Sequence, residues 1–145
     1  MLLVLPSEAD RRALESIPVR PTTPKDYSGV VVKKPWGHEQ QIFANHHFSI
    51  WRLDLYANSE TSMHCHRNKT TTIMVGDGSI VFSTLTEAHI LAKGDGAIVH
   101  PGVFHRSATI QGAILFETES PADKDDLVRL RDKYGREGQG YEQCA

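Results

Sequence analysis

Eight histidines occur in this chain of 145 residues, and three of them are spaced to do chemistry together. His64 and His66 lie two apart in a stretch, 61–66, that is typical of a β-strand. Side chains at i and i+2 of a strand point to one face, so both imidazoles can converge while Cys65 faces the other way. His105 follows a Pro-Gly turn on a later predicted strand. Three converging neutral imidazoles would suit a divalent transition metal with open coordination positions.

The spacing alone leaves a second interpretation open, in which these histidines are polar residues on a solvated strand face. If the strand lines a barrel, the imidazoles of His64 and His66 meet inside it, so the surrounding elements bear on this choice. Between Val30 and Glu119, short runs of Val, Ile, Thr and aromatic residues alternate with Gly, Asn and Asp, which predicts an all-β sandwich or barrel. Glycine-rich triplets at 76–78 and 94–96 provide the positive-φ residues of tight turns. The predicted strands are 29–33, 38–44, 47–56, 61–66, 70–75, 79–84, 87–91, 96–100, 103–109 and 112–119.

Helices are predicted on both sides of this β-rich region. A capping box at Ser7 and apolar residues at helical spacing predict a short helix over 8–16. Prolines 18, 21 and 24 then favour an extended arm that could wrap its own domain or reach a partner subunit. After Glu119, the sequence SPAD has the form of a helix N-cap followed by proline, which predicts a second helix ending near Lys133. We therefore expect an arm over 1–28, a barrel over 29–120 and a C-terminal helix and tail over 121–145.

The amino-acid composition and the net charge limit the classes of protein to which this chain could belong. A hydrophobic fraction of 39% and a charged fraction of 23% are typical of one globular domain. The net charge of −2 comes from 16 basic and 18 acidic residues spread along the chain, which predicts no nucleic-acid partner. The apolar start, 1–5, is too short for a signal peptide or a membrane span. Two cysteines form no disulfide framework, and we expect a cytoplasmic protein.

Two motifs in correct order resemble those of the cupin superfamily. HxH at 64–66, Thr71 and Gly78 reproduce the spacing HxH(x)4E(x)6G, with Thr71 in place of the glutamate. Gly94, HPG at 100–102 and His105 reproduce G(x)5PxG(x)2H, with His100 in place of proline. The resemblance implies a double-stranded β-helix, a jelly-roll barrel. It also implies a metal held by His64, His66, His105 and the position of Thr71.

Two further segments are similar to the C-terminal cupin domain of type II mannose-6-phosphate isomerases. KPWGHE at 34–39 resembles the entry to that domain, and DDLVRLRDKYGR at 125–136 resembles its closing segment. The resemblance implies that Arg136 handles the sugar phosphate, and Lys34 is a second candidate for the phosphate. A threonine hydroxyl at 71 is a weak neutral ligand with no useful pKa. Isomerase activity is therefore not carried over directly, and His100 is the titratable candidate for an acid–base group.

We therefore expect a metal-binding cupin that acts on a sugar phosphate or nucleotide-linked sugar, with Zn, Fe, Mn or Ni as the metal. One alternative is a three-histidine Fe(II) cupin dioxygenase, since the set without glutamate also resembles those enzymes. A non-catalytic ligand-binding cupin is the third possibility. Small cupins resemble one another in pairing their sheets, and the arm offers an extended segment for a neighbour's edge, so we expect a homodimer.

Overall fold

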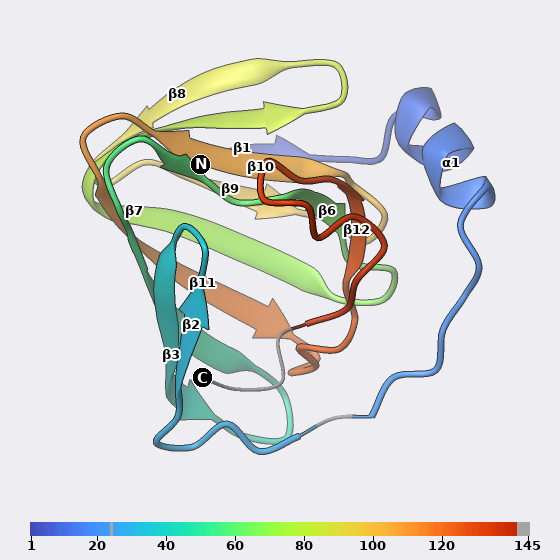
Figure 1. The fold of residues 1–145 in the computed structure, drawn as a ribbon, viewed down its shortest axis with the longest axis horizontal. Helices are drawn as coiled ribbons and strands as arrows, with labels where there is room; N and C mark the ends of the chain where they lie inside the picture. Colours follow the sequence, from blue (N-terminus) through green and yellow to red (C-terminus); the bar gives the residue numbers. More distant parts are fainter. Residues whose placement is uncertain (24, 142–145) are drawn as a thin grey trace.

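Two sheets that share one long strand form the body of the molecule (Figure 1). The computed structural model describes residues 1–23 and 25–141, so Pro24 of the predicted arm and Cys144 lie outside these ranges. The elements, in chain order, are β1 (Leu2–Val4), α1 (Glu8–Glu15), β2 (Val31–Lys34), β3 (Gly37–Ala44), β4 (Ser49–Leu55), β5 (Ser59–Glu60), β6 (Met63–Cys65), β7 (Thr70–Thr84), β8 (Ala88–Ala92), β9 (Gly96–Val99), β10 (His105–Thr109), β11 (Ala113–Ser120) and β12 (Val128–Arg131).

Strand order explains how the sheet curls into a barrel. The main path runs β12-β6-β10-β7-β11-β4-β3-β2, and β8 and β9 also pair with β7. The first half of β7 pairs with β9 and β11, and its second half pairs with β8 and β10. All of these pairs are antiparallel, whereas β1 joins β9 in parallel. The predicted all-β double-stranded β-helix is confirmed.

The turn predicted at 76–78 is not a turn. The strand β7 continues through it, because Asp77 and Gly78 remain paired with β11 across an irregularity in register. Gly78 has φ +75°, and a Cβ at this position would lie 2.5 Å from the carbonyl oxygen of Gly112. Glycine is required here because the two backbones approach closely. The glycines therefore let one strand pass from one sheet to the other.

The predicted N-terminal helix is confirmed, and the predicted C-terminal helix is wrong. In α1 the side chain of Ser7 accepts from the Asp10 N–H, and the Asp10 carboxylate accepts from the Ser7 N–H, which completes the capping box. After β11 the chain forms turns and then β12, which pairs with β6. Three backbone N–H groups of 67–69 donate to the Asp126 carboxylate. These long-range bonds are absent from a helix and outweigh the local capping pattern.

The proline-rich arm runs along one side of the molecule from α1 to β2 (Figure 1). It contacts its own domain, since the Arg67 guanidinium donates to the carbonyl oxygen of Ile17 at 2.7 Å and the Thr23 N–H donates to Asp125. These contacts agree with the predicted possibility that the arm wraps its own domain, and contact with a partner subunit stays a prediction. Within the described ranges, no helix is long and apolar enough to span a membrane.

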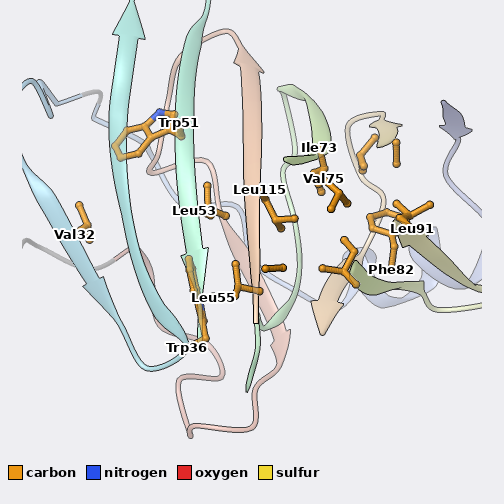
Figure 2. Close-up of a cluster of buried hydrophobic side chains, with 14 of the residues drawn as sticks. Val32, Trp36, Trp51, Leu53, Leu55, Ile73, Val75, Phe82, Leu91 and Leu115 are labelled. Carbon is orange, nitrogen blue, oxygen red and sulfur yellow. The ribbon is translucent and has the colours of Figure 1, made fainter. Parts of the chain in front are cut away.

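The main hydrophobic core lies between the sheets (Figure 2). Strand alternation places every second side chain inward, as in β4, where Trp51, Leu53 and Leu55 are buried. Trp51 and Leu115 are fully buried, and Phe82 extends the same core towards the second sheet. This core joins β4, β7 and β11, and its residues Trp36, Leu53 and Tyr141 also line the cavity described below.

Candidate metal centre

His64, His66 and His105 form one cluster in the structure. Their closest ring nitrogens all lie within 4.8 Å of one another. The ring centroids of His64 and His105 are 4.5 Å apart, and His66 lies 5.1 Å from His64. His64 belongs to β6 and stands opposite His105 of β10 in the antiparallel register, while His66 follows β6 directly. Cys65 is buried on the opposite face with Met63, as the strand alternation predicts.

One nitrogen of each imidazole ring is hydrogen-bonded to the backbone, and this bond orients the ring. The Nδ1 atoms of His64, His66 and His105 lie 2.7, 2.6 and 2.9 Å from the backbone carbonyl oxygens of Ser62, Asp126 and Val103, respectively. A carbonyl oxygen only accepts, so each Nδ1 carries the proton and each Nε2 keeps a free lone pair. Backbone partners of this kind orient the histidines of metal sites.

Burial keeps the three imidazoles neutral. It lowers the pKa of His64 and His66 well below 6.5, and it lowers the pKa of His105 to about 4. The nearby Lys69 ammonium further opposes protonation of all three rings. Within the described part of the chain, the buried Nε2 of His105 has no hydrogen-bond partner. Neutral rings with an unpartnered, inward nitrogen fit a divalent transition metal, which needs deprotonated ligands.

Thr71 faces the barrel interior from β7, beside the positions of Val99 and Glu119 on the neighbouring strands. Its side chain is 1% exposed, and no described residue bonds to its hydroxyl. The first motif therefore places an inward polar atom here, as the resemblance implies, but without a carboxylate. A ligand role for Thr71 stays a prediction.

A cavity of about 50 Å³ opens beside the histidines. Lys34 and Arg136 line it together with His64 and His66, so four of the predicted site residues share one pocket. The Asp132 carboxylate accepts hydrogen bonds from the Arg136 guanidinium at 2.9 and 3.0 Å, which fixes the orientation of that side chain. The Lys34 ammonium lies 3.8 Å from the centre of the Tyr141 ring.

His100 is not among the residues that line this cavity. It lies in the turn after β9, where its N–H donates to the Val4 carbonyl oxygen at 3.1 Å. Its catalytic role therefore stays a prediction, with no support from the pocket geometry.

Several charged residues that line the pocket were not predicted from the sequence. All of them line the cavity; Glu39, Lys69, Glu119 and Lys124 are buried and ion-paired, and the other two are Glu117 and Arg129. The one sequence signal was Glu117 and Glu119 at i and i+2, on the same face of β11 as the buried Leu115. Charged side chains that continue the core face of a strand indicate a polar site.

Comparisons with known proteins identify the fold. No protein-family model matches the sequence, and no curated protein matches it significantly. Among solved structures, an RmlC-like cupin from Shewanella frigidimarina is 21% identical, with a TM-score of 0.59, over 68% of this chain and 90% of that one. A candidate sugar phosphate isomerase from Acidithiobacillus ferrooxidans is 14% identical, with a TM-score of 0.52, over 59% of this chain and 61% of that one.

The salicylate 1,2-dioxygenase from Pseudaminobacter salicylatoxidans is also similar, at 19% identity and a TM-score of 0.56. That match covers 61% of this chain and 27% of the dioxygenase. At these identities the likeness concerns the fold and not the activity. The motifs, the two-sheet topology and these neighbours agree, and the chain has the double-stranded β-helix fold of the cupins.

Proposed function

We propose that this protein is a metal-dependent cupin enzyme that acts on a sugar phosphate or a nucleotide-linked sugar. The observation that supports it is the position of three neutral histidines, with free Nε2 atoms, beside a pocket rich in cationic side chains. The histidines suit a divalent transition metal, and the cations suit the phosphate of such a substrate.

In this proposal His64, His66 and His105 hold the ion. When bound, a divalent transition metal supplies a Lewis acid that polarises a substrate carbonyl or orients hydroxyl groups. Arg136 and Lys34 bind the phosphate, since both line the same cavity as the histidines. The Asp132 carboxylate holds Arg136 in place, so little conformational entropy is lost when the anion binds.

A second hollow gives room for the rest of the ligand. It has a volume of about 240 Å³ and shares Leu127, Arg129 and Tyr141 with the cavity at the histidines. The arm residues 17–22 form part of its wall. In this proposal a sugar bound at the metal extends into this hollow, beside the arm.

A direct test is solvent exchange into a substrate. Isomerisation of an aldose phosphate removes a proton from carbon 2, so deuterium from D₂O should enter mannose 6-phosphate in the presence of the Zn²⁺- or Mn²⁺-loaded protein. His66→Ala should abolish this exchange. Metal-loaded protein that exchanges no deuterium into any of a panel of aldose and ketose phosphates would contradict sugar-phosphate isomerisation.

The second candidate is an Fe(II) dioxygenase. It is favoured by Thr71, because a threonine hydroxyl in place of a carboxylate leaves three histidines as the strong ligands. Oxygen uptake by the Fe(II)-loaded protein with salicylate or another aromatic acid distinguishes this candidate from the first. Metal binding without exchange or oxygen uptake would favour a non-catalytic ligand-binding cupin.

We also propose that the protein forms a homodimer through its outer sheet face. Met74 of β7 and Phe116 of β11 are directly paired in register, and their side chains are 43% and 36% exposed. Adjacent apolar side chains on an exposed sheet face favour burial against a second copy of the same face.

A further inference from the structure

Among the described residues, three carboxyl groups line the cavity beside the histidines, and they belong to Glu39, Glu117 and Glu119. Two ammonium groups hold the first of them, since its Oε1 atom lies 3.7 Å from the Lys34 nitrogen and 3.5 Å from the Lys124 nitrogen. Burial opposes ionisation of Glu39, but its partners outweigh this effect and lower its pKa. This carboxylate therefore stays ionised near neutral pH and takes up no proton.

Glu119 is held in the same way. Its carboxylate pairs closely with Lys69 and lies 3.9 Å from the Lys124 nitrogen. The Ser49 hydroxyl donates a hydrogen bond of 2.9 Å to it. Burial opposes ionisation of Glu119, but Lys124 and Lys69 outweigh it and lower the pKa of Glu119 to about 2. This second carboxylate is likewise unable to accept a proton near neutral pH.

Glu117 has no such partners. Its side chain lines the same cavity, yet no described residue donates a hydrogen bond to its carboxyl or forms an ion pair with it. An ionised carboxylate offers about four lone-pair sites to donors. In Glu117 these sites remain available to a ligand that enters the cavity.

Strand pairing places Glu117 close to the first cupin-like motif. In the antiparallel pair of β11 and β7, Glu119 stands opposite Thr71 and Glu117 stands opposite Ile73. Directly paired residues share one face of the sheet, so Glu117 is the diagonal neighbour of Thr71, within reach of a long side chain. Thr71 occupies the position at which the motif has its glutamate. The neighbouring strand therefore offers a carboxyl beside the position where the motif has lost one.

The small size of the cavity brings Glu117 and the histidines to the same ligand. A volume of about 50 Å³ holds only a few groups the size of a water molecule. His64 and His66 line this volume together with Glu117. Besides burial, the charge of Lys69 acts on the pKa values of both Glu117 and His66, so Lys69 lies near both. A ligand that reaches the histidines from this cavity therefore also lies against the wall that carries Glu117.

Isomerisation of a sugar phosphate needs a base in the cavity. The Nε2 atoms of the three histidines are the metal ligands of the proposed function, and protonated lysine and arginine side chains have no lone pair to accept a proton. His100 does not line the cavity. Building on the proposed function, we propose that Glu117 is the catalytic base, and then the catalytic acid, that moves the proton between carbons 1 and 2 of the sugar phosphate.

The proton transfer is balanced within the substrate and this one side chain. A carboxylate oxygen of Glu117 takes the proton from carbon 2 of the aldose phosphate. The electron pair of the broken C–H bond forms the double bond between carbons 1 and 2, and the carbonyl pair moves to oxygen 1. The hydroxyl proton of oxygen 2 passes to oxygen 1. Glu117 then returns its proton to carbon 1 as the new carbonyl forms at carbon 2.

The surroundings of Glu117 suit both halves of this transfer. Burial raises its pKa to about 7, and the charges of Glu39 and Glu119 add to this effect, while Lys124 and Lys69 act against it. A carboxyl group with a pKa near the working pH is effective both as a base and as an acid.

Glu117→Gln is the first test, because it removes the base and keeps the shape of the side chain. The probe is the sugar phosphate, mannose 6-phosphate among them, into which the Zn²⁺-loaded wild type exchanges deuterium fastest. Exchange should fall by at least about 100-fold, while Zn²⁺ binding in isothermal titration should persist because the three histidines are unchanged. The matched control is Glu15→Gln, at an exposed position at the end of α1, and it should exchange deuterium like wild type.

Chemical rescue separates a catalytic role from a structural one. Glu117→Ala leaves space in the cavity for a small carboxylate, so added formate should restore part of the lost exchange. In the wild type, exchange at low substrate concentration should increase as the pH rises through about 7, since only the ionised carboxyl takes the proton. The formate-dependent exchange should lack this step, because formate is ionised throughout that range.

Unchanged exchange in Glu117→Gln would overturn the inference and leave the proposed function in place. Should Glu117→Gln fail to fold, Glu117→Ala gives the decision, and equal exchange with and without formate would contradict the role of Glu117. A wild type that binds Zn²⁺ but exchanges deuterium into no sugar phosphate would overturn the proposed isomerisation and this inference together.

Discussion

The Oδ1 atom of Asp10 accepts a hydrogen bond of 2.9 Å from the backbone N–H of Phe104, 94 residues further along the chain. The other carboxylate oxygen of Asp10 accepts from the N–H and the hydroxyl of Ser7, both at 2.8 Å. One buried side chain thus caps helix α1 and attaches that helix to the residue before the candidate ligand His105.

Asp10→Ala should lower the free energy of unfolding by about 2–4 kcal/mol, because it removes the helix cap and leaves the buried Phe104 N–H without an acceptor. Urea denaturation measures this change. Glu8→Ala, which removes an exposed partner of Arg11 and Arg12 in the same helix, should cost no more than about 1 kcal/mol. Equal losses from the two variants would show that the contact with Phe104 contributes nothing.

Divalent metal should stabilise the fold, because its ligands, two at β6 and one on β10, are brought together only in the native state. At a free concentration 100-fold above Kd, the gain is about 2.7 kcal/mol. Thermal melts with and without Zn²⁺ after chelation measure it. His66→Ala and His105→Ala should abolish the gain, and the exposed His47→Ala should retain it. The same response in all three variants would refute the ligand assignment.

Glu117 should make stability fall as the pH rises. Its folded pKa of about 7 lies above the ordinary value of 4.5, so the stability that it contributes below pH 4.5 is lost progressively up to pH 7. The full difference is about 3 kcal/mol. Urea denaturation of Glu117→Gln should therefore show a gain over wild type of up to that amount at pH 8 and a much smaller gain at pH 5. A constant difference between the two proteins at both pH values would contradict the raised pKa.

Thr71→Glu tests whether the chain has simply lost a metal ligand. A carboxylate at this position of the first motif should tighten Mn²⁺ and Zn²⁺ binding in isothermal titration, because an ionised oxygen replaces a neutral hydroxyl. Thr72→Glu, on the opposite face of β7, is the matched control and should not change the affinity. Weaker binding by Thr71→Glu, with a lower melting temperature, would indicate a site rebuilt around threonine, because a buried carboxylate without a partner is unfavourable.

Light scattering at tens of micromolar should give the mass of a dimer. Phe116→Glu should shift the protein towards monomer, because it places a charge at the centre of the proposed apolar face. Ile90→Glu changes a residue of β8 that is 79% exposed and lies away from that face, and it should leave the mass unchanged. A monomeric mass for the wild type would refute the dimer.

Local sequence determined several parts of this protein. The helix over Glu8–Glu15 follows from a capping box within four residues, which needs no distant partner. The pairing of His64 with His66, and the opposite orientation of Cys65, follow from strand alternation alone. The spacing of the two motifs then located His105, because the barrel topology that the motifs indicate brings their strands together.

Tertiary structure decided the remainder. The segment after Glu119 has a local signal for a helix, but β6 offers a hydrogen-bonding edge and residues 67–69 offer three N–H groups to Asp126. These partners lie some 60 residues away and cannot be weighed from the segment itself. The charge state of Glu117 depends in the same way on Lys69, Lys124 and Glu39, which come from separate parts of the chain. Burial and electrostatic interaction depend on distance in space. The sequence gives only the distance along the chain, so it does not show which of these residues lie close together.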